Sequence, residues 1–194
     1  MTFNMNVMPH PLNIKMSLLH RLVIIAAILT GMVFPAAAGL GLEGTEDQIK
    51  GAMMVNFIQF IKWPDQVMDR TGGVITIGVF GNDHFGHALD PIEGRTVGAY
   101  RLSIRRISQL DQLAECQVLF ICSSHAHLSS DIFRKVYGLP ILTIGEDEDF
   151  LHSGGIIRFY MDKNHVRFAI NKTAAFDADL KISAKLIEIA STFE

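Results

Sequence analysis

Three short runs of charge-free, β-prone residues constrain the fold of this chain more than any other feature of its sequence. The runs are VITIGVF at 74–80, QVLFIC at 117–122 and PILTIG at 140–145. A strand that is apolar on both faces is typical of a parallel sheet covered by helices on both sides. The sequence therefore predicts a sheet whose middle is buried.

Helical segments separate these runs. The first is predicted to begin at Thr45, a capping hydroxyl followed by two acidic residues, and to end at Trp63-Pro64. Another covers AHLSSDIFRKVYG at 126–138, and an alternating strand covers AYRLSIRRI at 99–107. Strands that alternate with helices predict an α/β fold, a mainly parallel sheet flanked by helices in a Rossmann-like sandwich.

The pattern changes near the C-terminus. GIIRFYM at 155–161 and HVRFAI at 165–170 read as two strands of an antiparallel β-hairpin, with a connection of about four residues around Asp162-Lys163-Asn164. A helical region is predicted from Asn171 onward. Its apolar stripe consists of Ile182, Leu186, Ile189 and Phe193.

The N-terminal part of the chain has the pattern of a secretory signal. Residues 22–38 contain no charge, follow basic residues and end in three alanines, so we expect cleavage after Ala38. Met16 is an alternative start. An uncleaved membrane anchor is the other interpretation, but a span needs about 20 apolar residues and this run is shorter. Residues 1–38 are thus interpreted as a signal peptide and 39–194 as a single domain.

Composition excludes two classes of protein. The chain is 49% hydrophobic and 19% charged, which is too apolar for a disordered chain. Its net charge of −3 does not suit a nucleic-acid binder that depends on phosphate contacts. The acidic run at 146–149 is interpreted as a solvated loop.

Export would place the two cysteines in an oxidising compartment. Cys116 and Cys122 flank one apolar run, and six steps along a strand separate them by roughly 20 Å. A disulfide needs Cα atoms within about 7 Å. The two cysteines are therefore predicted to be small core residues that do not bond to each other.

The predicted hairpin holds the candidate ligand-binding residues. Period-two alternation places Arg158, Tyr160, His165 and Arg167 on one face, opposite the apolar side chains of the two strands. Arginine forks suit carboxylates and phosphates and stack on rings. This face could hold a nucleotide, an amino acid or another anion. The alternative is the solvated outer face of an antiparallel pair.

Histidines and a cysteine also follow the predicted strands. His84, His87, Cys122, His125 and His127 could converge at the carboxyl edge of a parallel sheet, where a metal-dependent hydrolase would hold zinc. The sequence has no HExxH, no paired-cysteine motif and no GxSxG elbow. No catalytic residue, metal or cofactor is therefore assigned.

The motifs, taken in order along the chain, resemble those of the YfiR family of exported bacterial proteins. They are Phe57-x-x-Phe60-x-x-Trp63-Pro64, GVFGNDHFG at 78–86, CQVLFI at 116–121, Leu142-Thr143-Ile144, Phe150-x-x-x-Gly154-Gly155-Ile156-Ile157-x-Phe159, Arg167-Phe168-x-Ile170-Asn171 and Leu180-Lys181-Ile182-Ser183-x-Lys185-Leu186.

This resemblance implies a periplasmic regulatory α/β domain, often a homodimer, without catalysis. It implies binding to the periplasmic part of a membrane diguanylate cyclase, which is held inactive so that cyclic di-GMP and biofilm formation stay low. A histidine kinase ectodomain is another partner of this kind, and an outer-membrane lipoprotein can sequester the repressor. The chain departs from the family pattern at Ser124-His125, where Ser-Glu is common, and has too few cysteines for an intrachain redox switch.

Overall fold

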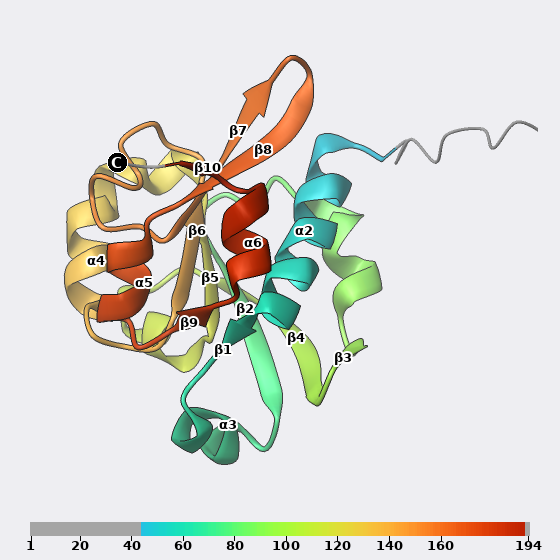
Figure 1. Ribbon diagram of the computed structural model, residues 1–194, viewed down its shortest axis with the longest axis vertical. Helices are drawn as coiled ribbons and strands as arrows, with labels where there is room; N and C mark the ends of the chain where they lie inside the picture. The colour runs from blue at the N-terminus through green and yellow to red at the C-terminus, as the bar shows by residue number, and fades with distance from the viewer. Residues whose placement is uncertain (1–43, 193–194) are drawn as a thin grey trace, which may run out of the picture. The chain divides into compact units, whose positions relative to one another are not determined.

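The computed structural model describes residues 44–192 (Figure 1). The predicted signal peptide with its cleavage site, the alternative start Met16 and Phe193 all lie outside the described residues. The extent of the domain, 39–194, therefore stays a prediction.

Helix α2 (Glu46–Phe60) begins where the sequence predicts. The Thr45 hydroxyl accepts a hydrogen bond from the Gln48 N–H at 3.3 Å, and the Gln48 side chain accepts one from the Thr45 N–H at 2.9 Å. The helix ends before Trp63-Pro64, because Ile61–Lys62 forms a short strand, β1, that pairs with β9 (Lys181–Ile182).

The predicted sheet is present and has eight strands in the order β10-β8-β7-β6-β5-β2-β4-β3. Five neighbouring strands, β4, β2, β5, β6 and β7, run parallel, and β3 and β8 pair antiparallel to the strands beside them. The fold class predicted from the sequence is confirmed. The strands are β2 (Val74–Phe80), β3 (Thr96–Val97), β4 (Tyr100–Ile107), β5 (Val118–Ile121), β6 (Leu142–Gly145), β7 (Ile157–Asp162), β8 (His165–Ile170) and β10 (Ser191–Thr192).

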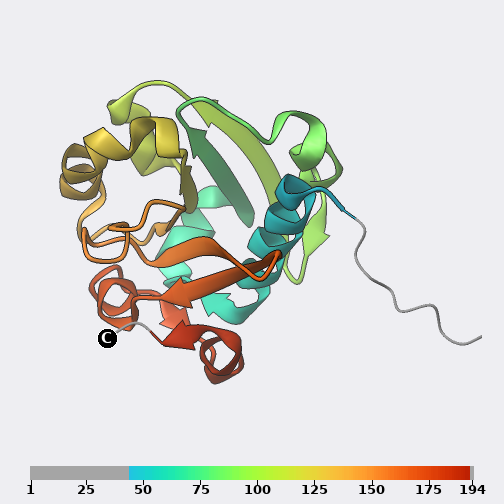
Figure 2. The same cartoon turned by 90° about the horizontal axis from the view of Figure 1, so that it is seen from above.

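Helices cover both faces of the sheet (Figure 2). Met54 and Phe57 of α2 and Leu186 of α6 pack with one set of strand side chains, and Ile132 and Val136 of α4 pack with the other. The helical elements besides α2 are α3 (Asp65–Thr71), η1 (Gly86–Ile92), η2 (Leu110–Glu115), η3 (Ser123–Leu128), α4 (Ser129–Val136), α5 (Lys172–Asp177) and α6 (Ala184–Ile189). No helix in this described part is both long and apolar enough to cross a bilayer.

The β7–β8 hairpin is confirmed, but its turn is tighter than predicted. Only Lys163 and Asn164 separate the strands, with φ of 47° and 64°. Two successive residues with positive φ form the turn whose twist matches that of the flanking strands. Asp162 belongs to β7 and pairs with His165.

The C-terminal helical region is divided into two helices. The prediction of its apolar stripe is wrong in part, because one of the residues assigned to the stripe is exposed. Asn171 does cap a helix, α5, but β9 and a new cap at Ser183 separate it from α6. Leu186 is buried, whereas Ile189 is 69% exposed. The reason is that β9 pairs with β1, so the chain turns before a continuous helix can develop.

Two glycines let the sheet close against Phe150. A Cβ at Gly145 or Gly155 would overlap the Phe150 ring, and one at Gly155 would also lie 2.7 Å from the Phe150 carbonyl oxygen. Within the motif Phe150-x-x-x-Gly154-Gly155, the second glycine is therefore required because a larger residue would overlap Phe150.

Gly155→Ala is expected to lower the free energy of unfolding by about 2–3 kcal/mol, because the added methyl has no space. Urea denaturation measures this. Gly138→Ala is the matched control, since nothing lies within 4 Å of a Cβ added there and the backbone strain from its φ of +70° is the cost that remains. It should cost about 1 kcal/mol. Equal costs for both variants would refute the overlap.

Candidate functional site

The hairpin gathers the four side chains singled out in the sequence on one face. Tyr160 lies directly opposite Arg167, and Asp162 lies opposite His165. Side chains of directly opposed residues point to the same side of a sheet. Tyr160 packs against the apolar cluster on the α4 side. This face is therefore partly covered at its base and solvated toward its tip.

Arg158 and Tyr160 form the base of this face. The guanidinium carbon of Arg158 lies 5.7 Å from the centre of the Tyr160 ring. The Tyr160 hydroxyl is hydrogen-bonded to the Ser191 hydroxyl of β10. The buried Nε of Arg158 has no hydrogen-bond partner among the described residues, and such an atom requires an explanation because buried donors are normally paired.

His165 and Arg167 form the exposed part of the face. The His165 Nδ1 lies 2.9 Å from the Lys163 carbonyl oxygen at the turn. The structure thus brings Arg158, Tyr160 and Arg167 together and places His165 nearer the tip. Ligand binding by these four residues stays a prediction.

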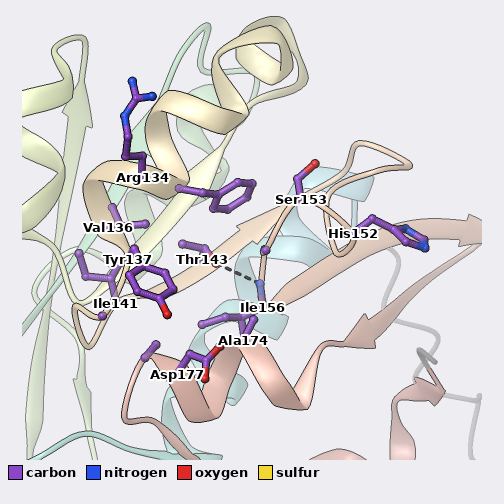
Figure 3. Close-up of a pocket in the computed structure, with 14 residues that line it drawn as sticks. Arg134, Val136, Tyr137, Ile141, Thr143, His152, Ser153, Ile156, Ala174 and Asp177 are labelled. Atoms are coloured by element: carbon purple, nitrogen blue, oxygen red, sulfur yellow. Dashed lines mark hydrogen bonds between the residues drawn. The ribbon is translucent and has the colours of Figure 1, made fainter.

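A cavity that the sequence did not predict lies between α4 and α5 (Figure 3). Its volume is about 450 Å³. Figure 3 shows Tyr137 and Asp177 near one another at its border, with the Arg134 side chain directed away. The hydrogen bond from the Ile156 N–H to the Thr143 hydroxyl, 3.0 Å long, crosses its floor. Apolar lining is supplied by Val136, Ile141, Ile156, Ala174 and Ala178.

The cavity exists because β6 and β7 diverge. They pair only through Ile144 with Ile157 and Gly145 with Arg158, so the beginning of β6 has no strand beside it on that side. No motif marks this divergence in the sequence. Gly154-Gly155 is the nearest signal, and it indicates a turn without indicating a cavity.

Hydrogen-bonded groups of two loops lie at the carboxyl edge of the parallel strands. Strand β2 lies between β4 and β5, so the connections that follow β2 and β4 lead to opposite sides of β2. In α/β proteins, ligands commonly bind at the carboxyl ends of strands where the strand order reverses in this way. Here the Asn82 N–H donates to the Ser124 hydroxyl at 3.1 Å, and that hydroxyl lies 2.9 Å from the His125 Nδ1. Gly81 has φ of +105°, and a Cβ there would lie 2.6 Å from the His125 ring.

A buried lysine joins α2 to this edge. Lys50 is 6% exposed and is ion-paired with Glu46 at 2.5 Å and with Glu146. Burial lowers the pKa of Lys50, but hydrogen bonds to Glu146 and Glu46, together with their charges, more than offset this and raise it. The prediction that the acidic run at 146–149 is solvated is therefore wrong for the Glu146 side chain. Its side chain is 19% exposed because it is drawn toward Lys50.

The histidines proposed as metal ligands have separate partners. The His84 Nδ1 lies 2.9 Å from Asp47 and its Nε2 lies 3.5 Å from Glu146, whereas the His87 ring lies on the surface, 2.8 Å from Asp90. The rings of His125 and His127 stack on each other with centres 5.9 Å apart. Across residues 44–192, no group of three or more His, Cys, Asp or Glu is arranged to hold a metal ion.

The two cysteines are free and buried, as predicted. Burial raises the pKa of both Cys116 and Cys122 from 9.0 to about 11. A thiol must ionise to react as a nucleophile, so neither thiol is activated at neutral pH.

We expect both thiols to react with Ellman's reagent far more slowly in the folded protein than in urea at pH 7.5. The pKa of each thiol is 9.0 in the unfolded chain and about 11 in the folded protein. The free energy of unfolding that the two buried thiols contribute is therefore complete below pH 9 and is lost as the pH rises to 11. Cys116→Ala should reduce this alkaline loss in urea titrations. Rapid labelling of both native thiols would contradict the burial.

Comparison with known proteins identifies the family. The model of the YfiR/HmsC-like family (DUF4154) matches residues 47–191. The chain belongs to this family. YfiR/HmsC-like proteins are in general periplasmic regulators of diguanylate cyclases and are regulatory, not catalytic. The resemblance predicted from the sequence is confirmed.

A solved structure shares the fold of this YfiR/HmsC-like chain. It is a conserved domain protein from Vibrio cholerae O1 biovar El Tor, with a TM-score of 0.52 and 11% sequence identity. The match covers 77% of this chain and 60% of the Vibrio chain, so this chain matches less than two thirds of that protein's length. At this identity the likeness concerns the fold alone. No curated protein matches.

Proposed function

We propose that this protein binds the extracytoplasmic domain of a membrane diguanylate cyclase, or of a related sensor such as a histidine kinase, in the periplasm and represses it. The observation that carries this is the family match over residues 47–191. By binding one conformation of the sensor more tightly, the domain shifts the sensor population toward the inactive state and lowers cyclic di-GMP.

The hairpin is the surface that we assign to this contact. A basic and aromatic face beside exposed apolar side chains suits a protein interface, in which tyrosine and arginine are enriched. Repression requires no catalytic group.

The test uses a full-length membrane diguanylate cyclase from the same organism, reconstituted in vesicles with the protein on the extracytoplasmic side. Cyclic di-GMP production is expected to fall in a saturable manner as the protein is added. A matched control uses a cyclase from which the extracytoplasmic domain has been deleted. Undiminished production, with no binding to the isolated ectodomain at about 50 µM, would refute the function.

Two further partners follow from the family resemblance and belong to the same proposal. A homodimer is expected, and light scattering on the purified protein measures its mass. An outer-membrane lipoprotein that removes the repressor from the cyclase should restore cyclic di-GMP production in the same vesicles.

A periplasmic module for a small anion is the second candidate function. The unpaired Nε of Arg158 beside the Tyr160 ring favours it, because a guanidinium can bind an oxyanion while stacked on a ring. Calorimetry with inorganic phosphate, AMP and glutamate tests it. Binding should be lost in the Arg158→Ala/Arg167→Ala double variant and retained in Arg134→Ala. Unchanged affinity in the double variant would exclude this site.

A further inference from the structure

The outer edge of β8 is open over much of its length. Strand β10 pairs with β8 only at Ala169 and Ile170. Within the described residues no other strand pairs with His165–Phe168 on that side. Figure 1 shows the corresponding part of the hairpin projecting beyond the central strands. Unpaired backbone groups on an edge strand can accept a further strand.

The hairpin is positively charged, although the chain is not. Residues 157–170 contain Arg158, Lys163 and Arg167 against a single acid, Asp162, while the whole chain has a net charge of −3. Along the open edge, His165 and Arg167 point to one face and are exposed. A strand added at this edge would place its own side chains directly beside them.

The opposite face of the same edge is apolar. Val166 and Phe168 point toward the α2 side, where the Phe168 ring packs on Phe57 with centres 4.8 Å apart. Met161, which is opposite Val166 in the register, is 46% exposed on this face. The edge therefore offers positive charge on one face and uncovered apolar surface on the other.

A second copy of β8 fits this edge poorly. An antiparallel pair with its two-fold axis at Val166 would place His165, which supplies no negative charge, beside Arg167 of the other copy. With the axis at Arg167, the two Arg167 side chains would face each other. Like charges directly opposed across strands are destabilising.

We propose that the open edge of β8 accepts an extended segment of a partner protein as an added strand, in which acidic and apolar residues alternate. The acidic side chains lie beside His165 and Arg167, and the apolar ones extend the surface of Val166 and Met161. Backbone hydrogen bonds supply affinity, and the alternating side chains supply specificity. This inference adds to the proposed function the chemistry of the segment that the partner contributes. It rests on the proposed function only for the identity of the protein that supplies the segment.

The probes are two capped heptapeptides, Ac-TEVEVET-amide and Ac-TKVKVKT-amide, titrated into the protein and followed by NMR. The acidic peptide should bind about fivefold more tightly than the basic one, since the cross-strand charge pair with Arg167 changes from attractive to repulsive between them. Amide exchange should slow at His165–Phe168. In Arg167→Glu, an exposed position, the preference should disappear or reverse. Arg70→Glu, on α3 away from the hairpin, is the matched control and should keep it.

Three results would overturn the inference: no saturable shift with the acidic peptide up to about 1 mM, a preference unaffected by Arg167→Glu, or protection that falls outside β8. Failure here is distinguishable from failure of the proposed function. If the cyclase ectodomain binds wild type and Arg167→Glu equally, the function stands and the edge is not its contact. If the acidic peptide adds to β8 but no ectodomain binds, the inference about the β8 edge is supported and the proposed regulatory function is refuted.

Discussion

Lys50→Ala is expected to lower the free energy of unfolding by about 3 kcal/mol. Lys50 is 6% exposed and compensates two carboxylates, Glu46 and Glu146. Removing it leaves the charge of Glu146, whose side chain is only 19% exposed, without its partner. Chemical denaturation with urea measures the loss.

The matched control is Lys62→Ala. Lys62 also pairs with a carboxylate, Asp65 at 3.5 Å, but both side chains are mostly exposed, so its loss should cost less than about 1 kcal/mol. Similar costs for the two variants would show that burial does not strengthen the Lys50 pairs.

The effect of Lys50 should also depend on pH. Its folded pKa is raised above 10.5, so the stability that it contributes is complete below pH 10.5 and is lost as the pH rises through the folded value. The difference between wild type and Lys50→Ala should accordingly be constant from pH 7 to 9 and shrink in stronger alkali.

Phe159→Ala is expected to cost about 4 kcal/mol, the largest effect among these substitutions. Phe159 is fully buried, and its ring stacks on Phe57 with centres 5.6 Å apart. Phe57 also contacts Phe168, so these three rings hold both strands of the hairpin against α2. The variant loses core packing and the support of the hairpin together.

Thermal and urea unfolding measure this effect, with Phe176→Ala as the matched control. Phe176 is 81% exposed and its removal should change stability by less than about 0.5 kcal/mol. If the Phe159→Ala protein remains folded, its amide exchange should quicken first in β7 and β8, because a two-stranded ribbon is marginal without packing. A uniform increase throughout the sheet would contradict the proposed role of the three rings.

The β7–β8 hairpin has a firmly packed base and an exposed tip. Its base is fixed by aromatic packing on one face and by the Tyr160–Ser191 hydrogen bond on the other. Its tip carries exposed charge. A rigid base with an accessible tip would let the hairpin serve as the proposed binding surface without requiring the sheet to rearrange.

The sequence by itself determined the layered α/β fold, the hairpin and the family. Continuous apolar runs such as VITIGVF mark buried parallel strands, and alternation placed Arg158, Tyr160, His165 and Arg167 on one face. These are local signals, since each depends only on neighbours along the chain.

Only the tertiary structure decided which distant groups meet. Glu146 is 96 residues from Lys50 in the chain, and the cavity depends on α4, α5 and the divergence of β6 from β7. The open edge of β8 exists because β10 is only two residues long and pairs at one end. Such features depend on which distant strands pair and over how many residues. Periodicity indicates which face of a strand is buried, but it does not identify the partner strand.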